Sequence, residues 1–441
     1  MLEFIHLRNV GPAPEMSLEF GPRINIITGD NGLGKSFLLD VAWWSLTRKW
    51  PRDLNDNLTS GYPAQPINTR EAATIEFGIK GKSSHVKYKS TYVPSDQAWV
   101  GKAGRPWNPG LVVYALADGG FAVWDPASNY WKPKGKTDVH ERLPAYVLSA
   151  RDVWDGLSSN IDRNTIKVCN GLIADWAYWT LEDKDSVKIL SELLWTLSNT
   201  SGTDGLTLGK SFARLSLDDD RYIPTVRMGY DHEVPILHTS LGVRRTAALA
   251  YMLLWAWLHN IRAAAKINEE PSNRLVVLID EVEAHLHPRW QRSIVPATLK
   301  VIDALAGKDP NRSIQLIAST HSPLVLASLE PIFDRDRDAW FDIDLEEHDV
   351  VLTKRDYVRQ GEISHWLVSE AFDLREPRSI EGEKAVQAAL TLLDSETPRL
   401  SEVEAVDRQL QLACLPDDDP FLVRWCYFVD QARKGALTQT P

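Results

Sequence analysis

A glycine-rich segment near the N-terminus has the residue types and spacing that bind phosphate. Residues 29–36, called the phosphate loop below, satisfy the pattern G-x-x-x-x-G-K-S/T. The glycines let backbone N–H groups point inward at phosphate oxygens, and a helix N-terminus directly after the loop adds partial positive charge. Lys35 can reach the β- and γ-phosphates of a nucleotide, and the Ser36 hydroxyl can ligate Mg²⁺. The predicted phosphate-binding residues are Gly29, Asp30, Asn31, Gly32, Leu33, Gly34, Lys35 and Ser36.

An acidic pair follows an apolar run far downstream. Residues 275–279 are continuously apolar, which predicts a buried strand, and Asp280 and Glu281 follow directly. Asp280 at the end of this strand can hold Mg²⁺ through water, and Glu281 projects far enough to polarise an attacking water. A phosphate loop needs such a partner for hydrolysis. The simpler alternative is that both carboxylates only cap the following helix.

A histidine follows the next apolar run along the chain. His321 comes directly after residues 314–318, which we expect to form a strand of the same sheet. At that edge His321 can donate a hydrogen bond to a γ-phosphate, whereas a purely structural loop histidine is the alternative. His285 and His287, with the nearby carboxylates, also suggest a transition-metal site. Since residues two apart face different directions on a helix, we prefer Mg²⁺ delivered with ATP.

These segments need a sheet that brings them together. Residues 24–27 predict a strand before the phosphate loop, and 36–44 predict a helix after it. Apolar strands that alternate with helices indicate a parallel sheet covered on both faces. Period-two patterns predict antiparallel strands at 2–7, 17–20, 72–92 and 111–124. The predicted fold class is therefore α/β, with a mixed sheet, an antiparallel β subdomain and a helical insertion.

Four parts are expected along the chain. Residues 1–142 form an N-terminal lobe that holds the phosphate loop, and 232–349 form a C-terminal lobe that holds the acidic pair and His321. Residues 143–231 form a mainly helical insertion, in which 183–198 is the best candidate for an amphipathic helix. Residues 350–441 are predicted to form a short strand followed by helices.

Composition limits the class of protein. Among 441 residues, 49 Lys and Arg stand against 60 Asp and Glu, and 44% are hydrophobic, which is typical of a globular protein. The longest apolar run, 247–258, is shorter than the roughly 20 residues that cross a bilayer. The N-terminus shows no secretory signal, and the three cysteines lack the spacing of a zinc site. We expect a cytoplasmic protein with reduced thiols and no membrane contact.

Four segments together resemble a known family. LEFIHLRNVG at the start, GDNGLGKS, LVVLIDEVEAHLHPRWQR and LIASTHSPLVLAS look like the RecF/SMC/OLD branch of ABC-type ATPases, close to the bacterial AAA-15/AAA-21 group. The resemblance covers about residues 1–330. It implies a P-loop ABC-type ATPase head in which the phosphate loop is Walker A, the acidic pair is Walker B and His321 is the switch histidine. ATP and Mg²⁺ are the implied cofactors, with Ser36 and Asp280 as metal ligands and Glu281 and His321 as catalytic residues.

The resemblance implies two further elements. A signature loop should contact the γ-phosphate of the opposite subunit, and Ser240 and Gly242 are its best candidates, although Leu241 replaces a usual glycine. A helix cap is the alternative role for Ser240. The family also uses a glutamine at a Mg²⁺-sensing loop, but residues 146–151 contain none. Ser149 or Arg151 are the candidates to replace it.

The resemblance also implies a cellular role. It favours an ATPase that dimerises around ATP, as a homodimer or higher oligomer, and acts as a conformational switch. This switch would control a separate effector protein, such as a nuclease, in bacterial anti-phage defence. The alternative is a DNA-binding ATPase of repair or recombination, in which the basic stretches 48–52 and 131–136 contact nucleic acid. A membrane-transporter subunit is disfavoured by the atypical signature and the long insertion.

Relatives of the OLD type often carry a nuclease domain of the Toprim type after the ATPase. Glu381 and Gly382 resemble the Glu-Gly pair of such a domain, but no apolar strand precedes them. We therefore expect no intrinsic nuclease.

Overall fold

The computed structural model describes residues 1–438 except 82–84, 102–106, 131–141, 162–163, 200–204, 308–311, 373, 396–397 and 417. Contacts group the chain into two units, Met1–Gly361 and Glu362–Pro441. None of the helices in the described part of the chain combines the length and apolar character that crossing a membrane requires.

A mixed eight-stranded sheet forms the centre of the first unit, in the order β18-β17-β3-β16-β15-β7-β8-β9. The five strands from β17 to β7 are parallel to their neighbours, and antiparallel strands complete both ends. The strands are β3 (Ile24–Gly29), β7 (Leu111–Ala115), β8 (Phe121–Trp124), β9 (Tyr146–Leu148), β15 (Arg274–Ile279), β16 (Ser313–Ser319), β17 (Ala339–Glu346) and β18 (Asp349–Arg355).

The apolar runs before the three predicted site segments form adjacent strands. β3, β16 and β15 lie side by side and are parallel, so the phosphate loop, His321 and the acidic pair all follow the same edge of the sheet. Every residue of β7 is buried, as are five of six in β15, because helices or a second sheet cover both faces. The predicted α/β fold class with a mixed sheet is confirmed.

An antiparallel five-stranded sheet, in the order β2-β1-β4-β5-β6, forms a second layer. Helix α1 (Lys35–Thr47) contacts β1 of this sheet and β3, β7, β15 and β16 of the central sheet. Eleven of its thirteen residues are buried, which explains why the helix is apolar on all sides. The strands are β1 (Leu2–Arg8), β2 (Glu15–Glu19), β4 (Thr74–Lys80), β5 (His85–Val93) and β6 (Ala98–Gly101), and the antiparallel β subdomain is thereby confirmed.

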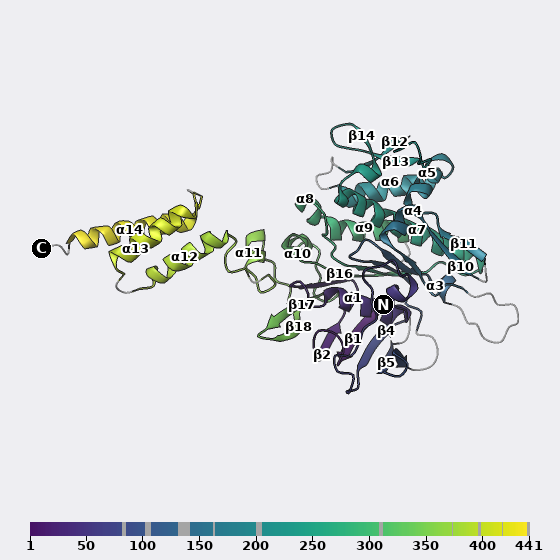
Figure 1. Ribbon diagram of the computed structural model, residues 1–441, viewed down its shortest axis with the longest axis horizontal. Helices are drawn as coiled ribbons and strands as arrows, with labels where there is room; N and C mark the ends of the chain where they lie inside the picture. The colour runs from purple at the N-terminus through teal and green to yellow at the C-terminus, as the bar shows by residue number, and fades with distance from the viewer. Residues whose placement is uncertain are drawn as a thin grey trace. The chain divides into compact units, whose positions relative to one another are not determined.

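Helices cover the other side of the central sheet, where α5, α6 and α7 lie opposite the antiparallel strands (Figure 1). The 26-residue α7 contacts β7, α6 and α9. Because it packs on several sides, fifteen of its residues are buried. The helices of this unit are α2 (Pro51–Leu54), α3 (Pro126–Asn129), α4 (Ala150–Asp155), α5 (Leu172–Leu181), α6 (Lys184–Ser198), α7 (Leu241–Lys266), α8 (Pro288–Gln291), α9 (Ile294–Ala306) and α10 (Pro323–Leu329), with a 3-10 turn at Ile236–His238.

Residues 143–231 combine three helices with strands. The helix predicted at 183–198 is confirmed as α6, whose N-cap Asp183 accepts a hydrogen bond from the Ser186 N–H. Two small antiparallel sheets were not predicted, and β9 belongs to the central sheet although the sequence placed it in the insertion. Strands of three to seven residues carry too few alternations to stand out in the sequence. The sheets are formed by β10 (Leu157–Ile161) with β11 (Asn164–Cys169), and by β12 (Thr207–Ala213), β13 (Ile223–Arg227) and β14 (Glu233–Pro235).

The second unit is helical in its described residues. Its helices are α11 (Ile363–Leu367), α12 (Ile380–Leu393), α13 (Leu400–Leu412) and α14 (Pro420–Thr438). A core of its own forms where α12, α13 and α14 meet, and Trp425 is only 1% exposed there. The Trp425 indole Nε1 donates to Asp407 Oδ1 over 3.1 Å, which satisfies the polar end of this buried ring.

Candidate functional site

The phosphate loop joins β3 to α1 in a conformation that requires glycine. Gly29 and Gly34 have φ angles of 134° and 102°, in the left-handed region. A Cβ at Gly29 would lie 2.1 Å from the Ile343 carbonyl oxygen, and one at Gly34 would lie 2.7 Å from Cγ of Pro12. Among the described residues, no side chain caps α1, whose N-cap is Gly34. The first N–H groups of the helix are therefore left for a ligand.

Lys35 folds back over this loop. Its Nζ donates to the carbonyl oxygens of Gly29 and Asp30 over 2.8 and 2.7 Å, and the residue is 5% exposed. Burial lowers the pKa of the Lys35 ammonium, while the carboxylates of Asp280 and Asp30 oppose that shift. The ammonium is thus held at the loop and faces the acidic pair.

Ser319, the last residue of β16, orders the acidic pair. Its Oγ donates to Asp280 Oδ1 over 2.6 Å and accepts from the Glu281 N–H over 2.8 Å. Asp280 is 1% exposed, so this bond fixes a buried carboxylate. Glu281 has a φ of 48°, a conformation that is uncommon for residues with a side chain and that recurs at functional sites. Ser319 stands two residues before His321, and its role depends on a contact between two strands that no local pattern indicates.

Glu283 holds the loop that carries His321. Its two carboxylate oxygens accept from the Thr320 hydroxyl and from the His321 N–H, each over 2.6 Å. Since the loop after β16 is bound through two hydrogen bonds to the loop after β15, their positions are coupled. Glu283 entered the sequence analysis only as one of the carboxylates near His285, so this positioning contact was missed.

The predicted residues gather at one pocket of about 220 Å³. Its wall consists of Asn31, Gly32, Gly34, Lys35, Ser36, Asp280, Glu281 and His321. Gly29, Asp30 and Leu33 belong to the same loop but do not line the pocket. The hydroxyl of Ser36 and the carboxylate of Asp280 are oxygen donors, which are the ligands that Mg²⁺ prefers. The residues present therefore fit a magnesium ion at this pocket.

The signature candidates do not line this pocket. Ser240 is the N-cap of α7, and its side chain accepts from the Val243 N–H over 3.4 Å. Gly242 packs against the loop after β15, where an added Cβ would lie 2.5 Å from the His285 carbonyl oxygen. In this chain both residues thus contribute to the start of α7 and to its contact with that loop.

Arg245, also on α7, connects the helix to the acidic pair. Its guanidinium donates to the carbonyl oxygens of Asp280 (2.8 Å), Glu281 (3.3 Å) and Ala117 (3.0 Å). Burial lowers the pKa of Arg245, and the carboxylates of Glu281 and Asp280 oppose that shift. This arginine fixes the backbone at the end of β15, a role that the sequence did not reveal.

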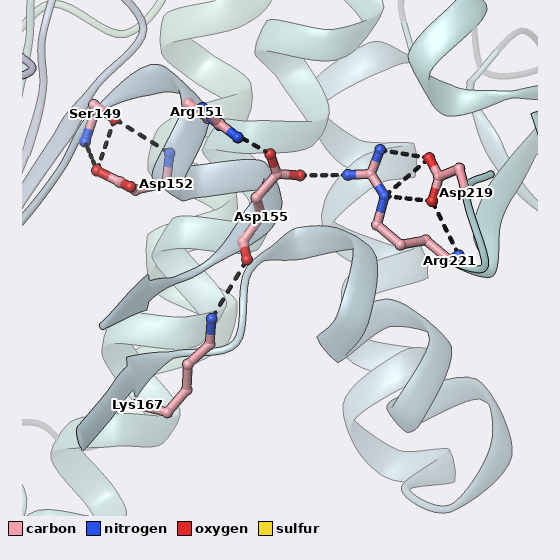
Figure 2. A network of polar contacts seen from close by, with 7 residues as sticks. All are labelled: Ser149, Arg151, Asp152, Asp155, Lys167, Asp219 and Arg221. Carbon is pink, nitrogen blue, oxygen red and sulfur yellow. Dashed lines mark hydrogen bonds and ion pairs between the residues drawn. The ribbon is translucent and has the colours of Figure 1, made fainter. Parts of the chain in front are cut away.

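The residues proposed to replace the glutamine lie at α4 (Figure 2). Ser149 caps α4 in a reciprocal arrangement with Asp152, which also accepts from Asn55 Nδ2 over 3.0 Å. Arg151 is exposed and pairs with Asp155 over 3.4 Å. Neither residue lines the 220 Å³ pocket.

His285 and His287, considered for a transition metal, have separate surroundings. His287 Nδ1 accepts from the Arg289 N–H at the start of α8, whereas His285 lines a different cavity. Within the described ranges, no group of three or more His, Cys, Asp or Glu side chains is placed to hold a metal ion.

Two of the three basic residues in the stretch 48–52 are bound within the chain, and the third, Lys49, is exposed. Arg48 stacks on the Trp44 ring, 3.9 Å from its centroid, and donates to Ser90 Oγ over 2.9 Å. Burial lowers the pKa of Arg48 to about 10. Arg52 donates to the Leu58 carbonyl oxygen over 2.7 Å. The other stretch, 131–136, lies outside the described residues.

Residues 24–327 match a family model, AAA_21, with the description "AAA domain, putative AbiEii toxin, Type IV TA system". The chain is 28% identical over 145 residues to "Retron Ec83 probable ATPase" of Escherichia coli. The matched segment covers 33% of this chain and 23% of that protein. It is 48% identical over 62 residues to "Retron Vc95 probable ATPase" of Vibrio cholerae serotype O1 biovar El Tor. This match covers 14% of this chain and 10% of that protein.

A third relative is "Septu protein PtuA" of Bacillus mycoides (strain KBAB4), 44% identical over 54 residues, or 12% of this chain and 6% of that protein. The matched segments thus span less than a quarter of the length of these relatives. Among solved structures, the chain is similar to the SMC head domain from Thermotoga maritima, with 12% identity, a TM-score of 0.37 and coverage of 80% of this chain and 99% of that one. It is also similar to RecF-ATPrS, with 13% identity, a TM-score of 0.36 and coverage of 81% and 98%.

Proposed function

Because the chain belongs to the AAA_21 family, we propose that it binds ATP with Mg²⁺ at the phosphate loop and hydrolyses it to ADP and phosphate. One observation carries the proposal: Lys35 and Ser36 from the N-terminal part line the same pocket as Asp280, Glu281 and His321 from far downstream. Phosphate-binding groups, oxygen ligands for a cation and a candidate base therefore meet at one place, as phosphoryl transfer requires.

In the proposed mechanism, backbone N–H groups of the phosphate loop and the Lys35 ammonium hold the β- and γ-phosphates. Ser36 and Asp280 would hold a magnesium ion, which would neutralise charge on the phosphates. Glu281 accepts a proton from the attacking water, and His321 donates a hydrogen bond to the γ-phosphate. The hydrogen bonds from Ser319 to Asp280 and from His321 to Glu283 keep these groups in place.

The proposed active unit is a dimer that closes around ATP. The pocket of about 220 Å³ lies below the range of about 300–1,000 Å³ typical of small-molecule sites, which supports a site completed by a second surface. We assign that surface to Ser240 and Gly242 of a second copy. ATP binding would favour the closed dimer and hydrolysis would open it, so that the γ-phosphate acts as a switch.

The proposed role is control of a separate effector protein, such as a nuclease, in anti-phage defence. The resemblance to ATPases of bacterial defence modules supports this role, and relatives named as retron ATPases and as a Septu protein agree with it. The alternative role at DNA receives no support from Arg48 or Arg52, because both are bound within the chain. If duplex DNA stimulates ATP turnover, and if this stimulation is lost as the salt concentration rises, the result would favour that alternative.

A Glu281→Gln substitution tests the proposed hydrolysis. It keeps the size of the side chain and removes the base, so ATP turnover should fall by at least about 100-fold while ATP still binds. In gel filtration with ATP and Mg²⁺, this variant should elute as a stable dimer. Glu270→Gln, at an exposed glutamate outside the pocket, is the matched control and should behave like the parent protein. Normal turnover in Glu281→Gln would exclude Glu281 as the base, and a monomer in saturating ATP would contradict the dimer.

A further inference from the structure

A second cavity, of about 350 Å³, lies beside the 220 Å³ pocket that holds Lys35 and Asp280, called the nucleotide pocket below. The two share none of their lining residues. Its walls are the β7–β8 turn, α4, the start of α7 and the loop after β15. Most of the lining is apolar, including Leu116, Phe121, Trp154, Leu249, Val282 and Leu286. Its volume falls within the range of about 300–1,000 Å³ typical of sites for small organic ligands.

Three charged side chains, Asp118, Arg244 and Arg245, lie in the wall of this cavity. Two of them are hydrogen-bonded to backbone groups of the protein. Asp118 accepts from the N–H groups of Thr59 and Gly120 over 2.8 and 2.9 Å, which fixes the β7–β8 turn. Arg245 donates to three backbone carbonyl oxygens. Both are therefore part of the scaffold rather than groups available to a ligand.

Arg244 is the third charged group and differs from the other two. Its Nε is buried, and the described residues provide no hydrogen-bond partner for it. Arg244 lines the cavity, so its guanidinium can pair with an anionic oxygen there through a charge-assisted hydrogen bond. Arg244 also lies in the first turn of α7, where the partial positive charge of the helix favours an anion.

Helix α4, which forms part of the cavity wall, is bound at both ends by polar contacts (Figure 2). Ser149 and Asp152 cap the first turn of the helix. At the last turn, Asp155 accepts from Arg221 Nη1 over 2.6 Å, and Arg221 also pairs with Asp219 over 2.7 Å. A short helix fixed at both ends gives the cavity a preformed wall, which lowers the cost of binding a ligand.

We propose that this cavity is a second ligand site, which takes a small organic anion with an apolar body and one acidic group paired with Arg244. The inference goes beyond the proposed ATPase, because it concerns a different cavity and does not depend on hydrolysis. Arg245 connects the two sites, because it lines the cavity and donates to the carbonyl oxygens of Asp280 and Glu281.

Binding of 8-anilinonaphthalene-1-sulfonate, followed by its fluorescence, tests the site, since this probe joins two aromatic groups to one sulfonate. N-phenyl-1-naphthylamine, which lacks the sulfonate, is the matched neutral probe. The parent protein should bind one sulfonate probe per chain and prefer it to the neutral one. Arg244→Met should weaken sulfonate binding at least about tenfold and remove that preference. Ala248→Phe, which fills the cavity from α7, should weaken binding of both probes.

Two control variants check that probe binding is specific to this cavity. Arg151→Met makes the same change at an exposed arginine of α4 outside the cavity and should leave probe binding unchanged. Lys35→Ala alters only the nucleotide pocket, so it should also leave probe binding unchanged. Thermal unfolding of each variant confirms that it is folded. Equal probe affinity in the parent, Arg244→Met and Ala248→Phe proteins would overturn the proposal, and so would loss of binding in Lys35→Ala.

Discussion

Helices α1 and α7 both begin beside the acidic pair, yet their first turns have different partners. At α1 the N-cap is Gly34, no side chain in the described part of the protein caps the helix, and Lys35 lines the nucleotide pocket. At α7 the N-cap Ser240 accepts from the Val243 N–H, and Gly242 lies against the His285 carbonyl oxygen. Among the residues that the structure describes, the N-cap of the first helix thus has no side-chain partner, whereas Ser240 and Gly242 at the start of the second helix contact their own chain.

The comparison shows that a glycine near a helix start has two distinct uses. In the phosphate loop, glycine permits left-handed backbone angles that turn N–H groups toward a ligand. At position 242 it permits close approach of a carbonyl group from another loop. We therefore expect substitution of Lys35 to act first on nucleotide binding, and substitution of Gly242 to act first on stability.

The largest expected effect on nucleotide binding is at Lys35. Lys35→Ala removes the ammonium group that lines the pocket and can pair with phosphate. We expect ATP affinity, measured by isothermal titration calorimetry, to fall by at least about 100-fold, or ~2.7 kcal/mol. Lys300→Ala, at an exposed lysine outside the pocket, should have no effect. Unchanged affinity in Lys35→Ala would remove the contrast between the two helix starts.

The next effect is at Gly242. Alanine normally stabilises a helix relative to glycine, but here its Cβ would lie 2.5 Å from the His285 carbonyl oxygen, so the helix or the loop must shift. Gly242→Ala should destabilise the protein by about 1–3 kcal/mol, measured by denaturant unfolding. Gly435→Ala on α14 is the matched control, because a Cβ there would meet no atom within 4 Å. Unchanged stability in Gly242→Ala would show that the helix and the loop adjust to the added Cβ without cost, and any loss of ATP turnover would then come from the proposed contact with the partner's nucleotide.

A pH-dependent effect on stability is expected at Asp40, inside α1. Tyr114 Oη donates to Asp40 Oδ1 over 2.9 Å, and burial raises the pKa of Asp40 from 3.8 to about 8. Between these values the folded protein holds a proton that the unfolded chain releases. The stability of the parent protein should therefore fall as pH rises from about 4 to 8, relative to a variant without this group.

Asp40→Asn keeps an acceptor for Tyr114 and removes the titration. Its stability relative to the parent should rise with pH by up to about 1.4 kcal/mol per pH unit and level off above about pH 8. Thermal unfolding at several pH values between 5 and 9 measures this difference. The exposed Asp349→Asn variant should follow the parent at every pH. A constant difference between the Asp40→Asn and parent proteins would show that Asp40 ionises normally in the folded state.

Much of the fold was predictable, because long apolar runs and the phosphate-loop pattern are local signals. The strands before the phosphate loop, the acidic pair and His321, and helix α6, all appear where the sequence indicated them. The short strands β9 to β14 were not predicted, because their few residues carry little periodicity. Half-buried strands such as β12 also lack the continuous apolar pattern of the central sheet.

The sequence by itself determined which residues have the chemistry of a nucleotide site, since residue type and local spacing fix whether a segment can form a phosphate loop or an acidic strand end. Only the tertiary structure decided how those residues are held. Ser319 bonds to Asp280, Glu283 to the His321 loop and Arg245 to the end of β15, and each pair is joined by the arrangement of neighbouring strands and helices. The close approach of Gly242 to the His285 carbonyl oxygen is also a feature that only the tertiary structure decides. The distance between a helix start and a loop depends on packing that no local sequence pattern encodes.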